Sequence, residues 1–213
     1  LKGSIQGIRK IPSEIFRSFE KKQNIATATL SHLQQNGMLY ITPDEHGYYF
    51  DKNSGSLHPL ADDAFLRFLS DITGLNSTET EFKYLSEQIQ TETKMRGNKT
   101  NVYQMAHYSQ AGHKLYVSDF IGGMLVLDGK KVTNAPNGLD GILFITSALA
   151  CPFRYLPSSE RIEGANIHNF LMPINCDPQS LIAPDEMKSL IFLWLLSIFF
   201  PELHPTKIIP TFI

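Results

Sequence analysis

Residues 100–127 have the sequence TNVYQMAHYSQAGHKLYVSDFIGGMLVL, and this stretch decides the expected fold class. Apolar and polar residues alternate within it, with the period of two that is typical of half-buried strands. Short linkers that contain glycine divide it into three runs, at 100–108, 113–120 and 123–127. Linkers of this length join antiparallel neighbours. The stretch therefore predicts an antiparallel β meander, and a further strand is expected at 142–145.

The sequence before the meander predicts helices and one small hairpin. Apolar residues recur at helical spacing over 12–22, 27–36, 62–72 and 78–95. Glycine follows the last three of these segments, as it commonly does at the end of a helix. Two short apolar runs, at 38–41 and 48–50, are separated by the turn-forming sequence Pro-Asp-Glu-His-Gly. The expected fold class is therefore α+β, with N-terminal helices, a small hairpin and the meander.

A helix followed by a hairpin is also the outline of a winged-helix DNA-binding domain. In that interpretation the segment 27–36 would be the recognition helix. It carries Ser31, His32, Gln34 and Gln35 but neither arginine nor lysine, so the sequence does not favour this alternative.

The most apolar part of the chain lies near its C-terminal end. The run 190–200 holds only about eleven residues, whereas a membrane-spanning helix needs about 20. Pro184 suits a first helical position, and Pro201 stops the run. The segment is therefore expected to be a buried helix and not a membrane span. The connector 151–178 precedes this helix, and a strand-like run, 207–213, follows it.

Composition limits the classes of function. The chain has 213 residues, of which 42% are hydrophobic, enough for a sizeable core. Its 19 basic and 21 acidic residues leave a net charge of −2, so any contact with nucleic acid must be local. Only Cys151 and Cys176 are present, which favours a reducing, cytoplasmic compartment. We expect an N-terminal helical and hairpin segment (1–60), an α+β accessory domain (61–178) and a C-terminal segment (179–213).

The common catalytic and metal-binding motifs are incomplete. The glycines and lysines of 123–131 resemble a phosphate-binding loop, but their spacing is one residue too long and no Ser or Thr follows the lysines, so a hairpin turn at Asp128-Gly129 explains them better. His107 and His113 could face each other across a hairpin, yet no third metal ligand is near. Ser147 and the two cysteines lack the surroundings of a known nucleophile. No catalytic, cofactor-binding or metal-ligating residue is assigned.

One local accumulation of basic residues remains as a candidate nucleic-acid interface. It consists of Lys94, Arg96 and Lys99, with Lys130 and Lys131 on the following hairpin. Tyr103 and Tyr108 are close in sequence, and basic residues beside aromatic rings can bind a phosphate backbone and its bases. Lysines that protect a solvated sheet edge are the alternative interpretation.

The chain resembles the region just before the P-loop of helicase-type ATPases from phages and mobile elements, including primase-associated proteins. Several short motifs, in this order, carry the resemblance: 57–60 (LHPL), 65–69 (FLRFL), 106–108 (AHY), 115–117 (LYV), 153–157 (FRYLP), Asn175, 194–195 (WL), Pro201, Pro205 and 208–213. They span about 150 residues.

This resemblance implies that 207–213 forms the first strand of an ATPase core and that the phosphate-binding loop would follow. ATP and Mg²⁺ are then expected for a parent protein, with no cofactor in this part, DNA as a partner, and a homo-oligomer formed through the ATPase core. No catalytic residue is carried over. Arg154 is a candidate phosphate contact, although Tyr155 replaces the usual second arginine. The alternatives are a protein-interaction or structural module of a phage or plasmid protein and, third, a self-contained enzyme.

Overall fold

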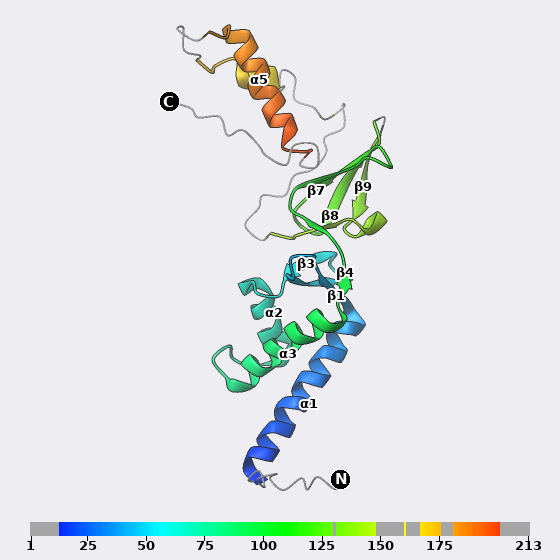
Figure 1. The fold of residues 1–213 in the computed structure, drawn as a ribbon, viewed down its shortest axis with the longest axis vertical. Helices are drawn as coiled ribbons and strands as arrows, with labels where there is room; N and C mark the ends of the chain where they lie inside the picture. Colours follow the sequence, from blue (N-terminus) through cyan, green and yellow to red (C-terminus); the bar gives the residue numbers. More distant parts are fainter. Residues whose placement is uncertain (1–12, 130, 148–159, 161–166, 176–180, 201–213) are drawn as a thin grey trace, which may run out of the picture. The chain divides into compact units, whose positions relative to one another are not determined.

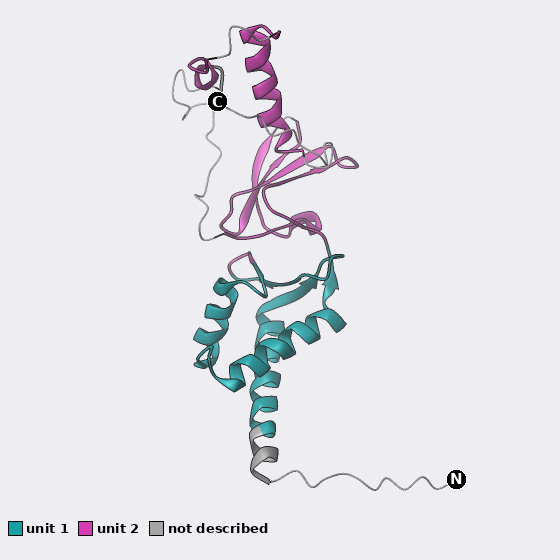
Figure 2. Ribbon diagram, turned by 60° about the vertical axis from the view of Figure 1, so that its left-hand side comes forward, with its two compact units in different colours: residues 1–53, 58–100 teal, residues 54–57, 101–213 magenta. Residues whose placement is uncertain are grey.

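The computed structural model describes residues 13–129, 131–147, 160, 167–175 and 181–200 (Figure 1). These residues form an α+β fold, as the sequence predicts. The chain divides into two compact units (Figure 2). Unit 1 comprises 1–53 and 58–100, and unit 2 comprises 54–57 and 101–213. The two units are described separately.

Unit 1 combines three helices with a small sheet. In chain order its elements are α1 (Ser13–Asn36), β1 (Gly37–Ile41), β2 (Gly47–Asp51), the second half of β3 (Ser56–Pro59), α2 (Asp63–Thr73), α3 (Thr80–Arg96) and β4 (Asn98–Lys99). The sheet order is β3-β2-β1-β4. The β1–β2 hairpin is antiparallel and confirms the predicted hairpin, while β4 adds to β1 in parallel.

The core of unit 1 lies where the three helices meet the sheet. Its fully buried side chains are Leu33, Tyr49, Phe65, Leu69, Leu85 and Ile89. The last four come from the apolar stripes that predict α2 and α3. Burying each such side chain contributes about 1.5–3 kcal/mol. Gly74, which follows α2, adopts the left-handed conformation with φ 68°, as expected of a glycine that ends a helix.

Helix α1 is longer than the sequence predicts. Two helices, at 12–22 and 27–36, are expected, but one continuous helix covers Ser13–Asn36. The prediction of a break was wrong because a polar stretch was taken for a linker. No glycine or proline occurs between 13 and 36, so nothing in the backbone interrupts the helix.

Unit 2 is built on the meander. Its elements are β5 (Val102–Tyr103), β6 (Ala106–Ser109), β7 (Lys114–Ser118), β8 (Gly123–Leu127), β9 (Val132–Pro136), the short 3₁₀ helix η1 (Leu139–Gly141), β10 (Leu143–Phe144), α4 (Ile167–Leu171) and α5 (Pro184–Ser197). The sheet order β6-β7-β8-β9, antiparallel throughout, confirms the meander. The strand expected at 142–145 is β10, which pairs in parallel with β5.

The first predicted strand of the meander, 100–108, is not continuous. Only its last part, β6, enters the meander, whereas β5 pairs with β10 and the preceding β4 joins the sheet of unit 1. Alternation identifies extended backbone but does not identify its partner, which explains the error. The missing fourth strand is β9, which follows the turn at Asp128-Gly129 that the sequence predicts.

Both faces of the meander are apolar, so both need cover. On one face Tyr116, Met124 and Val126 pack with Phe144 of β10. On the other face Ala106, Val117 and Leu125 form a second cluster, against which Phe199 packs. Strands that are buried on both sides are rich in apolar residues, as β8 is.

Residues 54–57 lie in unit 2 although their chain neighbours lie in unit 1. The backbone of Leu57 exchanges two hydrogen bonds with Thr146, one of them to the side-chain hydroxyl. Gly55 lies so close to Gly122 that a Cβ on Gly55 would come within 2.5 Å of the Gly122 carbonyl oxygen. The chain therefore crosses between the units at 53/54, 57/58 and 100/101. The three segments expected from the sequence, with boundaries at 60 and 178, stay a prediction.

Helix α5 forms where the sequence predicts it but is not a buried helix. Leu190, Leu193 and Leu196 are 50%, 59% and 41% exposed, and no residue of α5 is buried. The prediction rested on an apolar composition around the whole helix, and composition does not provide the covering side chains. Within the described ranges, no helix has both the length and the apolar character needed to cross a membrane. The strand expected at 207–213 lies outside the described residues.

Candidate nucleic-acid interface

Three of the predicted basic residues belong to the end of α3 and the strand that follows it. Lys94 and Arg96 belong to its last turn, and Lys99 lies in β4, two residues beyond Gly97. All three side chains are exposed. Lys131 is also exposed but belongs to unit 2, so it is not placed beside them. Lys130 and Arg154 lie outside the described residues.

The three cations differ in the charges around them. Arg96 donates from Nη1 to Glu92 Oε1 at 3.0 Å, an ion pair between successive turns of α3. Among the described residues no ion pair involves Lys94 or Lys99. Lys94 and Arg96 also lie at the negative end of the helix dipole, which stabilises them there without any ligand. Lys94 and Lys99 are therefore the cations most available to an anionic partner.

The two predicted aromatic residues belong to the other unit, so they are not placed relative to the basic residues. Tyr103 and Tyr108 both belong to unit 2. Tyr103 stacks on His107, with ring centroids 4.1 Å apart, and Tyr108 makes an edge contact with Phe200. Each ring is thus engaged within its own unit.

His107 and His113, which the sequence allows to face each other across a hairpin, are not paired. The register of β6 and β7 places His107 opposite Tyr116, while His113 lies in the connecting turn with φ 49°. Ser109 and Lys114 form the last pair of this register, so His113 lies in the turn and cannot pair with His107. In the part of the chain that the structure describes, no three His, Cys, Asp or Glu side chains are grouped as metal ligands.

A pocket of about 220 Å³ adjoins Lys94 in unit 1. The β1–β2 turn (45–48), the connection between β3 and α2 (59–61), and Gln90 and Lys94 of α3 line it. Gly47 allows these walls to approach, since a Cβ there would come within 2.8 Å of Leu60 Cδ1. The pocket thus combines one cation with polar and ring-bearing side chains from three separate elements.

The turn that forms one wall of this pocket has its own charge network. Asp44 Oδ2 lies 2.7 Å from His46 Nδ1. The pKa of Asp44 is lowered by hydrogen bonds from the side chains of Thr42 and His46. Burial raises the pKa of Tyr48, so its hydroxyl remains protonated at neutral pH. Glu45 is held in the left-handed region with φ 63°, an uncommon conformation for a residue other than glycine.

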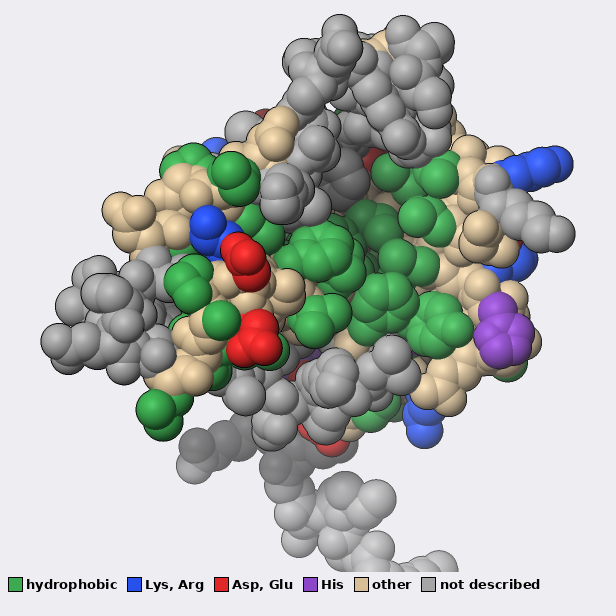
Figure 3. Space-filling model, turned by 90° about the horizontal axis from the view of Figure 1, so that it is seen from above, with side chains coloured by type: hydrophobic (Ala, Val, Ile, Leu, Met, Phe, Trp, Pro, Cys, Tyr) green, Lys and Arg blue, Asp and Glu red, His purple; other side chains and the backbone are tan. Residues whose placement is uncertain are grey.

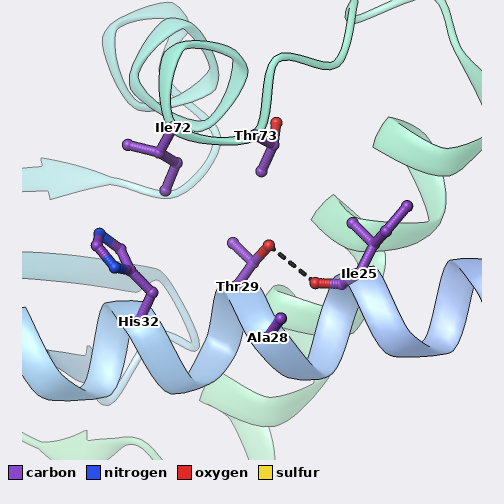
Figure 4. A pocket seen from close by; sticks show the side chains of 6 residues that line it. All are labelled: Ile25, Ala28, Thr29, His32, Ile72 and Thr73. Atoms are coloured by element: carbon purple, nitrogen blue, oxygen red, sulfur yellow. Dashed lines mark hydrogen bonds between the residues drawn. The ribbon is translucent and has the colours of Figure 1, made fainter.

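A second concavity of about 300 Å³ lies between α1 and the end of α2 (Figure 4). Its lining side chains are Ile25, Ala28, Thr29, His32, Ile72 and Thr73. The Thr29 hydroxyl donates to the Ile25 carbonyl oxygen at 2.9 Å, so it is engaged within its own helix. The groove is mostly apolar and contains no Lys or Arg, so it is not part of the basic interface.

The sequence did not predict a hydrogen-bonded cluster in unit 2, formed by Tyr116, Asp140 and Lys114. The hydroxyl of Tyr116 donates to Asp140 Oδ2 at 2.7 Å, and Lys114 Nζ donates to the same oxygen at 3.4 Å. Burial, with Asp140 as hydrogen-bond partner, raises the pKa of Tyr116 to about 12. The Tyr116 hydrogen bond, followed by Lys114, lowers the pKa of Asp140. The only signal was Asp140-Gly141, which indicates a turn but not a partner.

Comparison of the chain with protein-family models, with curated proteins and with solved structures gives no match.

Proposed function

We propose that this chain is an accessory, non-catalytic region of a DNA-replication helicase-like P-loop ATPase from a phage or mobile element. Its role would be to position DNA or neighbouring subunits for the motor. The observation that supports the proposal is the pair of exposed lysines, Lys94 and Lys99, on either side of the α3–β4 junction. ATP and Mg²⁺ would belong to the motor, and no residue of this chain is assigned to them.

The charge distribution supports a local contact with phosphates. The chain has a net charge of −2, so overall attraction to DNA is absent. Lys94 and Lys99 have no ion-pair partner among the described residues, so they can release counterions from a phosphate backbone. A contact of two lysines is weak and moderately dependent on salt, as expected of a region that guides DNA and does not hold it alone.

Fluorescence anisotropy with a labelled single strand of about 20 nucleotides tests the proposal. The wild-type chain should bind at about 50 mM salt and lose about seven-fold in affinity towards about 200 mM, as two phosphate contacts to a single strand predict. The double variant Lys94→Ala/Lys99→Ala should bind more weakly and should reduce the slope of log K against log salt by about 1.4, since each contact to a single strand contributes about 0.7.

The matched control is Lys52→Ala/Lys83→Ala, which removes the same charge from exposed positions of unit 1 away from the junction. It should leave the salt slope unchanged. Equal effects of the two double variants would show that Lys94 and Lys99 act only through the net charge of the chain and not through a specific contact with DNA. If the wild type fails to bind single-stranded and duplex DNA even at low salt, the DNA role is excluded.

A second candidate function is a protein-interaction or structural module without a nucleic-acid role. The exposed leucines of α5 favour it, and Figure 3 shows that hydrophobic side chains gather on one face of the molecule. Sedimentation of the wild-type chain and of Leu190→Glu/Leu193→Glu tests this candidate. Association that the wild type shows and the variant lacks would support it, and a monomeric wild type would remove self-association through α5.

A further inference from the structure

We infer that the pocket beside Lys94 accepts one unpaired base of a single-stranded nucleic acid, whose adjoining phosphate contacts Lys94. This inference rests on the proposed function and names the form of DNA that the site takes. Its evidence is the composition, size and position of the pocket.

The size of the pocket matches a small flat group. Its volume is about 220 Å³, below the roughly 300–1,000 Å³ of sites that enclose drug-sized ligands. A complete duplex, or a ligand of several rings, is too large for this space. A single base extended from a strand is of suitable size, because its sugar and phosphate remain outside.

The lining side chains suit the chemistry of a base. Tyr48 and Pro59 provide ring surfaces, and stacking on an aromatic ring is the usual way in which proteins hold unpaired bases. Glu45 and Gln90 provide carboxylate and amide groups, which hydrogen-bond the edges of bases. Glu45 repels a phosphate, so the anionic part of the ligand is expected to stay at the side of Lys94.

The position of Lys94 connects the pocket with the basic cluster. Lys94 lines the pocket and also belongs, with Lys99, to the exposed cations at the α3–β4 junction. A nucleic-acid strand whose phosphate contacts Lys94 can therefore place the adjoining base in the pocket, which Lys94 also lines. Neither the groove between α1 and α2 nor the Tyr116–Asp140 group combines a cavity with unpaired cations in this way.

The decisive experiment compares oligonucleotides that have the same charge but differ in bases. Anisotropy is measured with a labelled thymidine oligonucleotide of about 20 residues, with an abasic strand of the same length, and with duplex DNA. The wild type should bind the thymidine strand at least about five-fold more tightly than the abasic strand, which corresponds to the lower end of the contribution that stacking of one base makes. Ala61→Phe, which fills the pocket from an exposed position, should abolish this preference without weakening duplex binding.

Gln90→Ala is a second variant, at an exposed position of α3. It tests the pocket independently if Ala61→Phe does not fold. Its matched control is Gln88→Ala, which removes the same side chain two positions earlier, outside the pocket. Gln90→Ala should reduce the preference for the base-bearing strand, and Gln88→Ala should not.

The outcomes separate this inference from the proposed function. Equal binding of thymidine and abasic strands by the wild type, with both still dependent on Lys94 and Lys99, overturns the pocket inference and leaves the DNA role intact. Failure of the wild type to bind any of the three probes overturns both.

Discussion

The side-chain amide of Asn137 donates to the carbonyl oxygen of Gly55, 82 positions earlier in the chain, at 3.0 Å. The same amide group donates to the Phe144 carbonyl oxygen at 2.8 Å and accepts from the Phe144 amide at 2.9 Å. Asn137 is only 5% exposed, so these partners replace water completely. One residue thus fixes the segment 54–57 and strand β10 in unit 2.

Replacement of Asn137 by alanine should therefore destabilise the protein. The change leaves buried carbonyl and amide groups without partners, at a cost of about 1–3 kcal/mol for each unsatisfied group. Urea unfolding followed by circular dichroism measures the loss. The control is Asn134→Ala, at an exposed position of β9, which should change the stability by less than about 0.5 kcal/mol. Similar stabilities of the two variants would contradict the role given to Asn137.

The approach of Gly55 to Gly122 makes a second prediction. Gly122 has φ 111°, and a Cβ there would come within 2.5 Å of the Ser54 carbonyl oxygen. Gly129 has φ 86° but no atom within 4 Å of such a Cβ. Gly129→Ala should cost only the backbone strain, about 1–2 kcal/mol, whereas Gly122→Ala should cost clearly more. Thermal unfolding of the two variants measures the difference, and equal losses would show that the segment 54–57 can move away.

The pair Tyr116 and Asp140 predicts a pH dependence on the acid side. Because the folded pKa of Asp140 is lowered below its ordinary value of 3.8, its ionised form stabilises the fold above that value. This stabilisation is lost as the pH falls through the lowered pKa. Wild type should therefore unfold at a higher temperature than Asp140→Asn at neutral pH, with the gap closing below about pH 3.8. Asparagine tolerates the positive φ of 55° at this position, so the variant tests charge and not backbone strain.

Tyr116→Phe provides the companion measurement, since it removes the donor without changing the ring. In Tyr116→Phe the unfolding temperature should depend less on pH on the acid side, because Asp140 has lost its main hydrogen-bond partner. A gap between wild type and Asp140→Asn that persists unchanged down to about pH 2 would contradict the assignment.

The core of unit 1 predicts a large cost for truncation within α3. Leu85 is fully buried, and Leu85→Ala should destabilise by about 2–5 kcal/mol through lost burial and the cavity that remains. Met95, on the same helix, is 73% exposed, and Met95→Ala should change the stability by less than about 0.5 kcal/mol. Chemical denaturation distinguishes the two, and comparable losses would mean that α3 packs elsewhere in solution.

Local sequence patterns predicted individual elements better than their partners. The stripe around Phe65 and Leu69 identified α2 because helical spacing depends only on near neighbours. Short apolar runs between turns that contain glycine identified β7 and β8 for the same reason. These patterns did not reveal that Asn98-Lys99 pairs with β1 while Val102-Tyr103 pairs with β10, since that choice depends on contacts between distant segments.

The candidate site shows the same limit. Lys94, Arg96 and Lys99 were found because they lie close in sequence, and the structure places them at the end of α3 and in β4 with exposed side chains. The pocket beside Lys94 was not found, because its walls come from three separate segments between positions 45 and 94, and their contact depends on the tertiary fold. The environment of Asp140 was missed for a similar reason, because its partners Lys114 and Tyr116 lie 26 and 24 positions earlier.

The placement of residues 54–57 in unit 2 has a consequence for synthesis on the ribosome. Gly55 emerges 82 residues before Asn137, its hydrogen-bond partner. At about 5–20 residues per second this interval is roughly 4–16 s, during which the segment has no permanent neighbour. The helices of unit 1 can pack together in that time, but residues 54–57 cannot form their hydrogen bonds until the second half of the chain has been synthesised. The segment 54–57 of the nascent chain therefore reaches its final structure only after Asn137 and Thr146 have been synthesised.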